Sequence, residues 1–243
     1  MRMTSSWRSY MGVLAMLAVA WLGGAKDTLA QGLGLTWDEC GAGVSNKTFA
    51  CDTNVGAETI VVSFTPTFDV PKVVQAQVRM NVCFQGLTMP DWWRVLGSGS
   101  CRPGALSVRV EAPGLDCAPA WDPAGGASVK IIQRGVTVLN GFEFVPFVTL
   151  EDSSRALDMV VGQPYELMRV ILDNSRTVGA GACGGCSIGA SVAAYVAWLY
   201  TIDGQIINVG SAPSITWQVA TTSCRAITPA RRATWGAVKT LYR

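Results

Sequence analysis

Residues 72–84, KVVQAQVRMNVCF, alternate between apolar and polar side chains. Successive side chains of a β-strand point to opposite faces, so a period of two predicts a strand with one buried face. Such a strand needs a core on one side only, which is typical of two sheets packed together. The predicted inward set is Val74, Ala76, Val78, Met80 and Val82.

Further strand signals recur along the chain between turn signals. They lie at 59–64, 106–111, 128–133, 141–150, 164–173 and 214–221. Several short strands separated by turns predict a sandwich or a barrel. We therefore expect residues 31–224 to form one all-β domain, an antiparallel β-sandwich stapled by disulfides and either immunoglobulin-like or jelly-roll. One tract, 153–162, resembles a helix and is compatible with a single turn.

Residues 191–210 predict a β-hairpin. Asp203 and Gly204 suit a two-residue turn in which both central residues have positive φ. A regular strand before this turn would place one set of side chains on a single face: Val192, Ala194, Val196, Trp198, Tyr200 and Ile202.

Residues 1–30 have the three parts of a secretory signal peptide: an arginine-containing start, an apolar run at 11–22, and small Ala30 as a cleavage point. The apolar run is shorter than the ~20 residues that a spanning helix needs. We expect export to the periplasm, the cell surface or the medium, with a retained anchor as the alternative. No later segment predicts a membrane span.

All eight cysteines follow this segment, and an even count in an exported chain predicts disulfides. The sequence alone does not fix their pairing. Because short loops close easily, we expect Cys40–Cys51, Cys101–Cys117 and Cys183–Cys186, which leaves Cys83–Cys224.

The glycine-rich stretch TVGAGACGGCSIGA, residues 177–190, holds Cys183 and Cys186. A redox-active pair normally begins a helix, whereas the residues after Cys186 alternate like a strand. A zinc site needs a second ligand pair, and the remaining spacings do not supply one. Because residues i and i+3 of a β-turn lie within disulfide reach, we interpret the pair as a staple. A redox centre and a metal clasp remain the alternatives, and we expect no cofactor and no metal.

The chain contains no histidine. This excludes Ser-His-Asp and Cys-His catalysis and the HExxH zinc hydrolases. No phosphate-binding or calcium-binding motif occurs either. A pair of carboxylates remains available for sugar hydrolysis. Candidate acids in predicted loops are Asp38, Glu39, Asp91, Asp116, Asp122, Glu151 and Asp152.

Charge is unevenly distributed. Residues 31–224 hold 11 basic and 16 acidic residues, a net charge of −5, which argues against nucleic acid as a partner. Residues 225–243 hold five basic residues and no acid. A short helix from Thr234 would align an apolar stripe, and so short a helix must dock on its own body, another chain, a surface component or a sorting machine. The stripe is Trp235, Val238, Leu241 and Tyr242.

Trp92 and Trp93 are adjacent, and consecutive side chains diverge, so we expect at least one of them to be exposed. With Asp91 and Arg94 they predict a patch on which a sugar ring or an apolar partner could stack. The alternative is that one indole belongs to the core and the other covers a loop held by Cys101.

Four stretches, LTWDECG…NKTFAC, MPDWW, TVGAGACGGC and TWGAVKTLYR, together resemble a group of exported proteins from environmental bacteria with no known activity. The resemblance covers most of the chain after the signal peptide. It implies bacterial export, disulfides and a recurring C-terminal tail, and it supplies no activity or site residues.

These observations predict an exported, non-catalytic module, structural or binding, with a glycan or a surface protein as its partner. The alternatives are a carbohydrate-active enzyme that uses a carboxylate pair and a subunit of a surface assembly.

Overall fold

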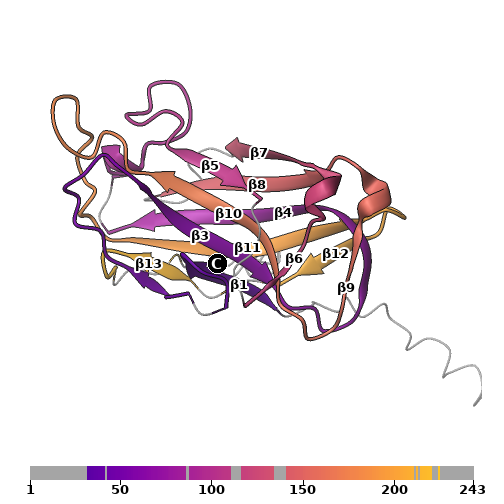
Figure 1. The fold of residues 1–243 in the computed structure, drawn as a ribbon. Helices are drawn as coiled ribbons and strands as arrows, with labels where there is room; N and C mark the ends of the chain where they lie inside the picture. Colours follow the sequence, from indigo (N-terminus) through magenta and orange to yellow (C-terminus); the bar gives the residue numbers. More distant parts are fainter. Residues whose placement is uncertain are drawn as a thin grey trace, which may run out of the picture.

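The computed structural model describes residues 32–41, 43–85, 88–110, 116–133, 141–210, 212, 214–220 and 224. These residues form two β-sheets packed face to face, and Figure 1 shows β3 and β10 in front of β4 and β11. The expected all-β sandwich is confirmed. The expected signal peptide (1–30) and tail (225–243) lie outside the described residues. Among the residues described, no helix is long and apolar enough to cross a membrane.

The small sheet is antiparallel in the order β1, β3, β10 and β5, and β6 adds to β10 in parallel. Its strands are β1 (Leu33–Trp37), β3 (Ala57–Phe64), β5 (Leu106–Arg109), β6 (Ala118–Pro119) and β10 (Tyr165–Asp173).

The large sheet has the order β2, β13, β11, β4, β8 and β7, with β12 on β11 and β9 on β4. Only the β2–β13 pair in it is parallel among the described strands. Its strands are β2 (Asn46–Lys47), β4 (Val70–Phe84), β7 (Ala127–Gln133), β8 (Gly141–Leu150), β9 (Leu157–Met159), β11 (Ala190–Thr201), β12 (Ile206–Val209) and β13 (Ile215–Trp217).

Three short 3-10 helices lie in the connections: η1 (Asp91–Trp93), η2 (Pro123–Gly125) and η3 (Ser153–Arg155). The helix-like tract 153–162 therefore forms one turn only, and its middle part is strand β9. In the described part of the chain, no helix longer than a single turn packs on either sheet.

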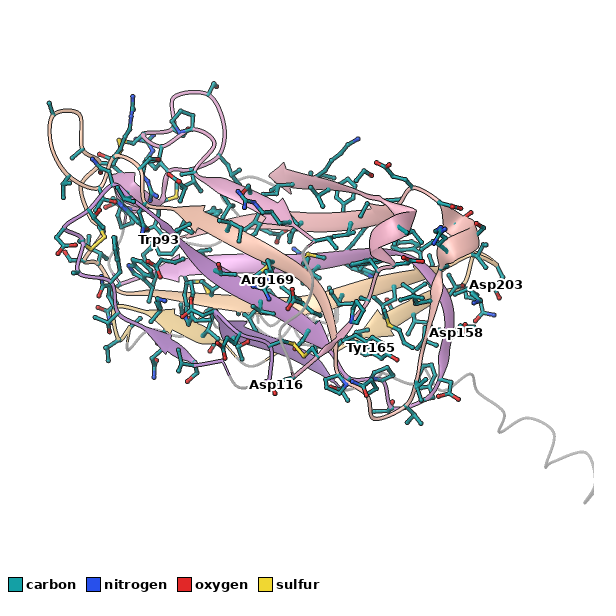
Figure 2. The ribbon with its side chains drawn as sticks, in the orientation of Figure 1. Trp93, Asp116, Asp158, Tyr165, Arg169 and Asp203 are labelled. Atoms are coloured by element: carbon teal, nitrogen blue, oxygen red, sulfur yellow. A yellow bond between two sulfur atoms is a disulfide. The ribbon has the colours of Figure 1, made fainter. Side chains whose placement is uncertain are left out.

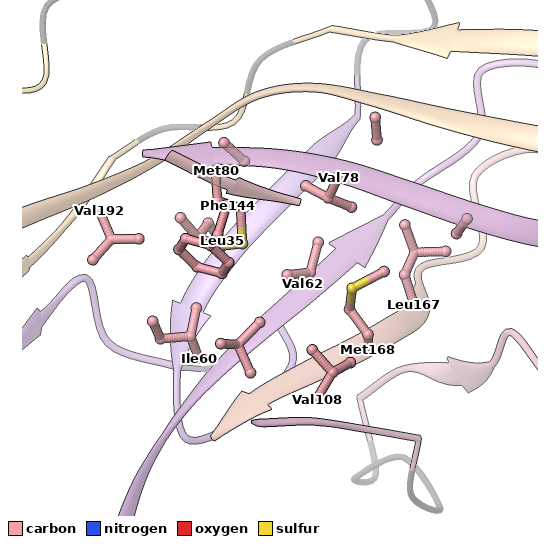
Figure 3. Packing of buried hydrophobic residues seen from close by; sticks show 14 of the residues in the cluster. Leu35, Ile60, Val62, Val78, Met80, Val108, Phe144, Leu167, Met168 and Val192 are labelled. Carbon is pink, nitrogen blue, oxygen red and sulfur yellow. The ribbon is translucent and has the colours of Figure 1, made fainter. Parts of the chain in front are cut away.

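The alternation in β4 is realised as predicted from Ala76 onward, but the expectation for Val74 is wrong: the register shifts there, and Val73 is buried instead while Val74 is half-buried. Its even-numbered apolar residues from Ala76 to Val82 face the small sheet and are buried. Met80 lies opposite Phe144 of β8, and Val82 lies opposite Val192 of β11. Figure 3 shows these side chains meeting those of the small sheet in the core between the layers.

Strand β11 departs from regular alternation because it contains a β-bulge. Its register against β4 shifts by one residue between Ala194 and Val196. A one-residue shift moves every later side chain to the other face. Leu199 is therefore buried in the core, whereas Trp198 and Tyr200 point outward. The expectation that Val192 through Ile202 share one face is wrong beyond Ala194.

The hairpin between β11 and β12 is confirmed, but its turn differs from the predicted one. Thr201 N–H donates to Gln205 O (3.1 Å), and Gly204 N–H donates to Thr201 O (3.0 Å). Only Gly204 of the turn has positive φ, at 83°. The loop is thus three residues long and ends on a glycine in the left-handed region, a common alternative to the two-residue turn.

Four disulfides join the described cysteines: Cys40–Cys117, Cys51–Cys186, Cys83–Cys224 and Cys101–Cys183. The expected Cys83–Cys224 bond is present.

The expected short-range pairs Cys40–Cys51, Cys101–Cys117 and Cys183–Cys186 are wrong. The sequence separations of the four bonds run from 77 to 141 residues. A folded chain pairs the cysteines whose Cα atoms it brings close, here 5.4 to 6.0 Å, whatever their separation in sequence. Cys183 and Cys186 consequently bond to two different loops.

We predict that the Cys51→Ala/Cys186→Ala variant unfolds with a free energy about 2–5 kcal/mol lower than the native chain, because a long cross-link constrains the unfolded state. Denaturant titration measures this loss, and non-reducing peptide mapping should still find Cys101 joined to Cys183. A native chain in which Cys183 is joined to Cys186 would contradict the pairing.

Candidate functional site

Two parts of the molecule are candidate sites. The first is the end of the sandwich marked by Trp93 in Figure 2, opposite the end that carries Asp158 and Asp203. We call it the loop end: the loops 48–56, 88–105 and 174–189. The Cys51–Cys186 and Cys101–Cys183 bonds join these three loops to one another.

Trp92 and Trp93 are buried beneath these loops, with exposed fractions of 0% and 2%. The predicted exposed indole is therefore wrong. Both residues belong to the single turn η1, and both indoles pack on Trp217, with ring centroids 5.1 and 5.7 Å apart. Trp92 Nε1 also donates to Thr177 Oγ1 (2.9 Å). No face of either ring is free to stack on a ligand.

Asp91 and Arg94, the other two residues of the predicted patch, are exposed and face each other. Arg94 Nη1 donates to Asp91 Oδ1 at 3.1 Å. An exposed ion pair of this kind contributes little to stability. Without an indole beside it, the pair offers no stacking surface.

A residue that the sequence did not single out holds the loop end together. Arg102 is 1% exposed, and its guanidinium lies 3.7 Å from the centroid of the Trp92 ring. It donates from Nη1 to Trp92 O and from Nε to Ser175 O, both at 2.8 Å. Burial lowers the pKa of Arg102 to about 10, so the group remains charged at neutral pH. One cation thereby connects two of the loops through a stacked ring and two carbonyls.

Candidate catalytic acids meet at Arg155. Its side chain lies 3.0 Å from Asp122 Oδ2 and 3.6 Å from Asp152 Oδ2. Asp122 accepts from Ala124 N–H at the start of η2, and Asp152 accepts from Ser154 at the start of η3. The Ala124 amide lowers the pKa of Asp122 most, and the Ser154 hydroxyl lowers the pKa of Asp152 most. A glycosidase acid needs the opposite shift, so this pair caps two turns.

All eight cysteines are in disulfides, so the redox and metal interpretations of Cys183 and Cys186 are wrong. Among the described ranges, no group of three or more cysteine, aspartate or glutamate side chains is arranged to hold a metal ion.

The second candidate is the outer face of the large sheet. Trp198 of β11 lies opposite Gln77 of β4, which lies opposite Phe147 of β8; Tyr200 lies opposite Gln75. Directly opposed residues share a face, so these five form one surface, all half-buried. We call Gln75, Gln77, Phe147, Trp198 and Tyr200 the aromatic face.

Exposed aliphatic side chains flank the aromatic face on both sides. Ile206 of β12, opposite Tyr200, is 55% exposed, and Ile132 of the edge strand β7 is 49% exposed. Apolar side chains therefore lie on β12, β11, β8 and β7, with Gln75 and Gln77 of β4 between those of β11 and β8. Aromatic and aliphatic side chains exposed on one face of a domain are typical of an interaction site.

The polar atoms of this face are free. No hydrogen bond within the described structure uses the Trp198 indole, the Tyr200 hydroxyl or the amides of Gln75 and Gln77. By contrast, four buried indoles donate to protein acceptors: those of Trp37, Trp92, Trp121 and Trp217. The indole of Trp93 also has no partner among the described residues, but it is buried, so Trp198 differs from the core tryptophans in having a half-buried ring at the surface.

At the loop end, Cys224 covers part of this side of the sheet. This residue bonds to Cys83 of β4, and its Sγ lies 3.2 Å from Ser191 O. The Tyr195 hydroxyl, which belongs to the bulge, donates to Cys224 O (3.5 Å), and burial raises the pKa of Tyr195. Cys224 therefore packs on the outside of β4 and β11.

A partly buried ion pair lies between Cys224 and the aromatic face. Arg79 donates from Nε and Nη2 to Glu143 Oε2, at 2.8 and 2.6 Å, and Glu143 is almost fully buried. Because its partner neutralises it, Glu143 leaves no free negative charge on the surface.

The predicted tail residues Trp235, Val238, Leu241 and Tyr242 lie outside the described residues.

The sequence does not identify Trp198 as a surface residue, because a regular β11 would place its side chain on the same face as that of the core residue Val192. The extra residue at the β11 bulge, which no turn signal in the sequence marks, points the Trp198 side chain to the opposite face of the sheet.

No protein-family model and no curated protein matches the chain. Among solved structures, the second type II cohesin module of the cellulosomal adaptor ScaA scaffoldin of Acetivibrio cellulolyticus is similar at 9% identity and a TM-score of 0.38, over 79% of this chain and 98% of that one. A cohesin module from a Clostridium perfringens family 33 glycoside hydrolase is similar at 8% identity and a TM-score of 0.35, over 76% and 96%. The assignment of the fold rests on the sheet topology described above.

We predict that Arg102→Lys lowers the free energy of unfolding by about 2–4 kcal/mol, because an ammonium cannot stack on Trp92 and reach both carbonyls. Arg94→Lys, at an exposed pair, should change it by less than about 0.5 kcal/mol. Denaturant titration of the two variants makes the comparison. Equal stabilities would show that Arg102 does not hold the loops.

Proposed function

We propose that this protein is an exported, non-catalytic binding module whose partner is another protein, held on the aromatic face. The observation that carries the proposal is the row of half-exposed aromatic side chains that the β11 bulge turns away from the core. The rings of Phe147, Trp198 and Tyr200 lie on strands that are hydrogen-bonded into the sheet, so the scaffold holds them in place before any partner arrives.

The composition of this surface supports a protein partner. Its centre holds tryptophan, tyrosine and phenylalanine, its flanks hold Ile132 and Ile206, and Glu143 on the same side of the sheet is buried and paired. Interface centres are enriched in aromatic residues and poor in unpaired charge. Arg79 and Lys130 supply basic groups at its rim.

Export is supported independently of the face. Four disulfides are typical of proteins that fold in an oxidising compartment. The N-terminal thirty residues have the pattern of a secretory signal. A partner would accordingly be met outside the cytoplasm, at the cell surface or in the periplasm.

A glycan is the second candidate, favoured by one observation. The free amides of Gln75 and Gln77 lie between the aromatic rows of β11 and β8, where they can bond sugar hydroxyls while a ring stacks on Trp198. The two candidates share a face and differ in the chemistry of the ligand.

Site-specific photo-crosslinking in the producing cell tests the proposal. A benzophenone side chain at Ile206 should crosslink to a defined protein, and Trp198→Ala should reduce the yield severalfold because it removes the central ring. The matched control is the same group at Val55, an exposed aliphatic position at the loop end. Equal crosslinking from Val55, or yields unaffected by Trp198→Ala, would contradict the proposal.

A glycan array distinguishes the second candidate. The glycan alternative predicts binding by the purified native protein, lost in Trp198→Ala and in Gln77→Ala and retained in Arg94→Ala. An array without signal, together with a protein crosslink from Ile206, would leave the protein partner as the function.

A further inference from the structure

The C-terminal tail begins on the same face that the proposed partner uses. Cys224 is held on the outer side of β4 by its bond to Cys83, beside Ser191 and Tyr195. Cys83 and Gln77 have the same parity on β4, and the β4–β8 register is unbroken between them. The disulfide therefore attaches the start of residues 225–243 to the sheet surface that carries the aromatic face.

The distance from this attachment to the aromatic face is within reach of the tail. Gln77 lies six residues before Cys83, or ~20 Å along the strand at ~3.3 Å per residue. Trp235 lies eleven residues after Cys224, and an extended chain of that length spans up to ~36 Å. The apolar stripe of the tail can thus be placed over Trp198 and Tyr200 without strain.

The two surfaces are also chemically matched. The tail offers Trp235, Val238, Leu241 and Tyr242 at helical spacing, and a helix this short is unstable without a surface to pack on. The aromatic face offers half-buried rings and amides that make no hydrogen bond with the other described residues. Asp203, three residues after Tyr200, lies at the far end of the sandwich, as Figure 2 shows, and is an acid that the tail's Lys and Arg residues can approach.

We infer that residues 225–243 dock on the aromatic face of their own chain and cover Trp198 and Tyr200 until a partner displaces them. This inference uses the face of the proposed function and adds a means of regulating it. The disulfide keeps the tail at a high local concentration, so a weak contact is enough to cover the face.

The test places a benzophenone side chain at position 235 of the full-length, oxidised protein. After irradiation, the monomer is digested and its crosslinked peptides are identified by mass spectrometry. The matched control carries the group at Thr240, which lies off the apolar stripe of the tail. A second background, Trp198→Ala/Tyr200→Ala, removes the docking surface.

We expect crosslinks from position 235 to peptides of β4, β8 or β11 within one chain, independent of protein concentration. The yield should fall severalfold in the Trp198→Ala/Tyr200→Ala background and should be low from position 240. Crosslinks to the small sheet or the loop end, crosslinks only between two chains, an unchanged yield in the double variant, or no crosslink would each overturn the inference.

Failure of this inference and failure of the proposed function are distinguishable. The position-235 experiment contains no partner and reports only on the tail. A partner that crosslinks from Ile206 while position 235 finds no contact on the large sheet would retain the function and remove its regulation. The reverse result would retain the docked tail and leave the face without a protein partner.

Discussion

The one-residue bulge in β11 is the constraint on which the arrangement of the large sheet depends. Strand β11 lies between β4, β12 and β13, so its register determines what four strands present to each side. Before the bulge, Val192 and Ala194 fill the core; after it, Ala197 and Leu199 do so. The side chains that the bulge turns away from the core, Trp198 and Tyr200, lie on the outer surface. One local backbone irregularity thus produces a continuous core and an aromatic face together.

The loop end is stabilised in a different way, because its long irregular loops have no regular backbone pairing to hold them. Two disulfides and the buried Arg102 cross-link the loops there, and the indoles of Trp92, Trp93 and Trp217 fill the space beneath them. The apolar area buried by these rings adds to the stabilisation that the cross-links give. The aromatic residues that looked most available in the sequence are consequently part of the core.

How far the sequence predicts this structure depends on how local the responsible physics is. The alternation of β4 and the β11–β12 hairpin follow from neighbouring residues, and both were predictable. Disulfide pairing depends on which Cα atoms the finished fold brings together, so three of the four bonds join cysteines 77 to 135 positions apart against expectation. The bulge, the burial of Trp92 and the role of Arg102 depend on contacts with distant strands and loops. The aromatic face could be found only after the bulge was known, although a strand with large aromatic residues at alternate positions was visible in the sequence.

The most direct test of the bulge compares two neighbouring truncations. Leu199→Ala removes a side chain from the core and should lower the free energy of unfolding by about 2–5 kcal/mol. Trp198→Ala removes a larger side chain from the surface and should lower it by less than about 1 kcal/mol. Denaturant titrations of both variants measure these values. If Trp198→Ala were the more destabilising change, β11 would run without the bulge and the aromatic face would not exist.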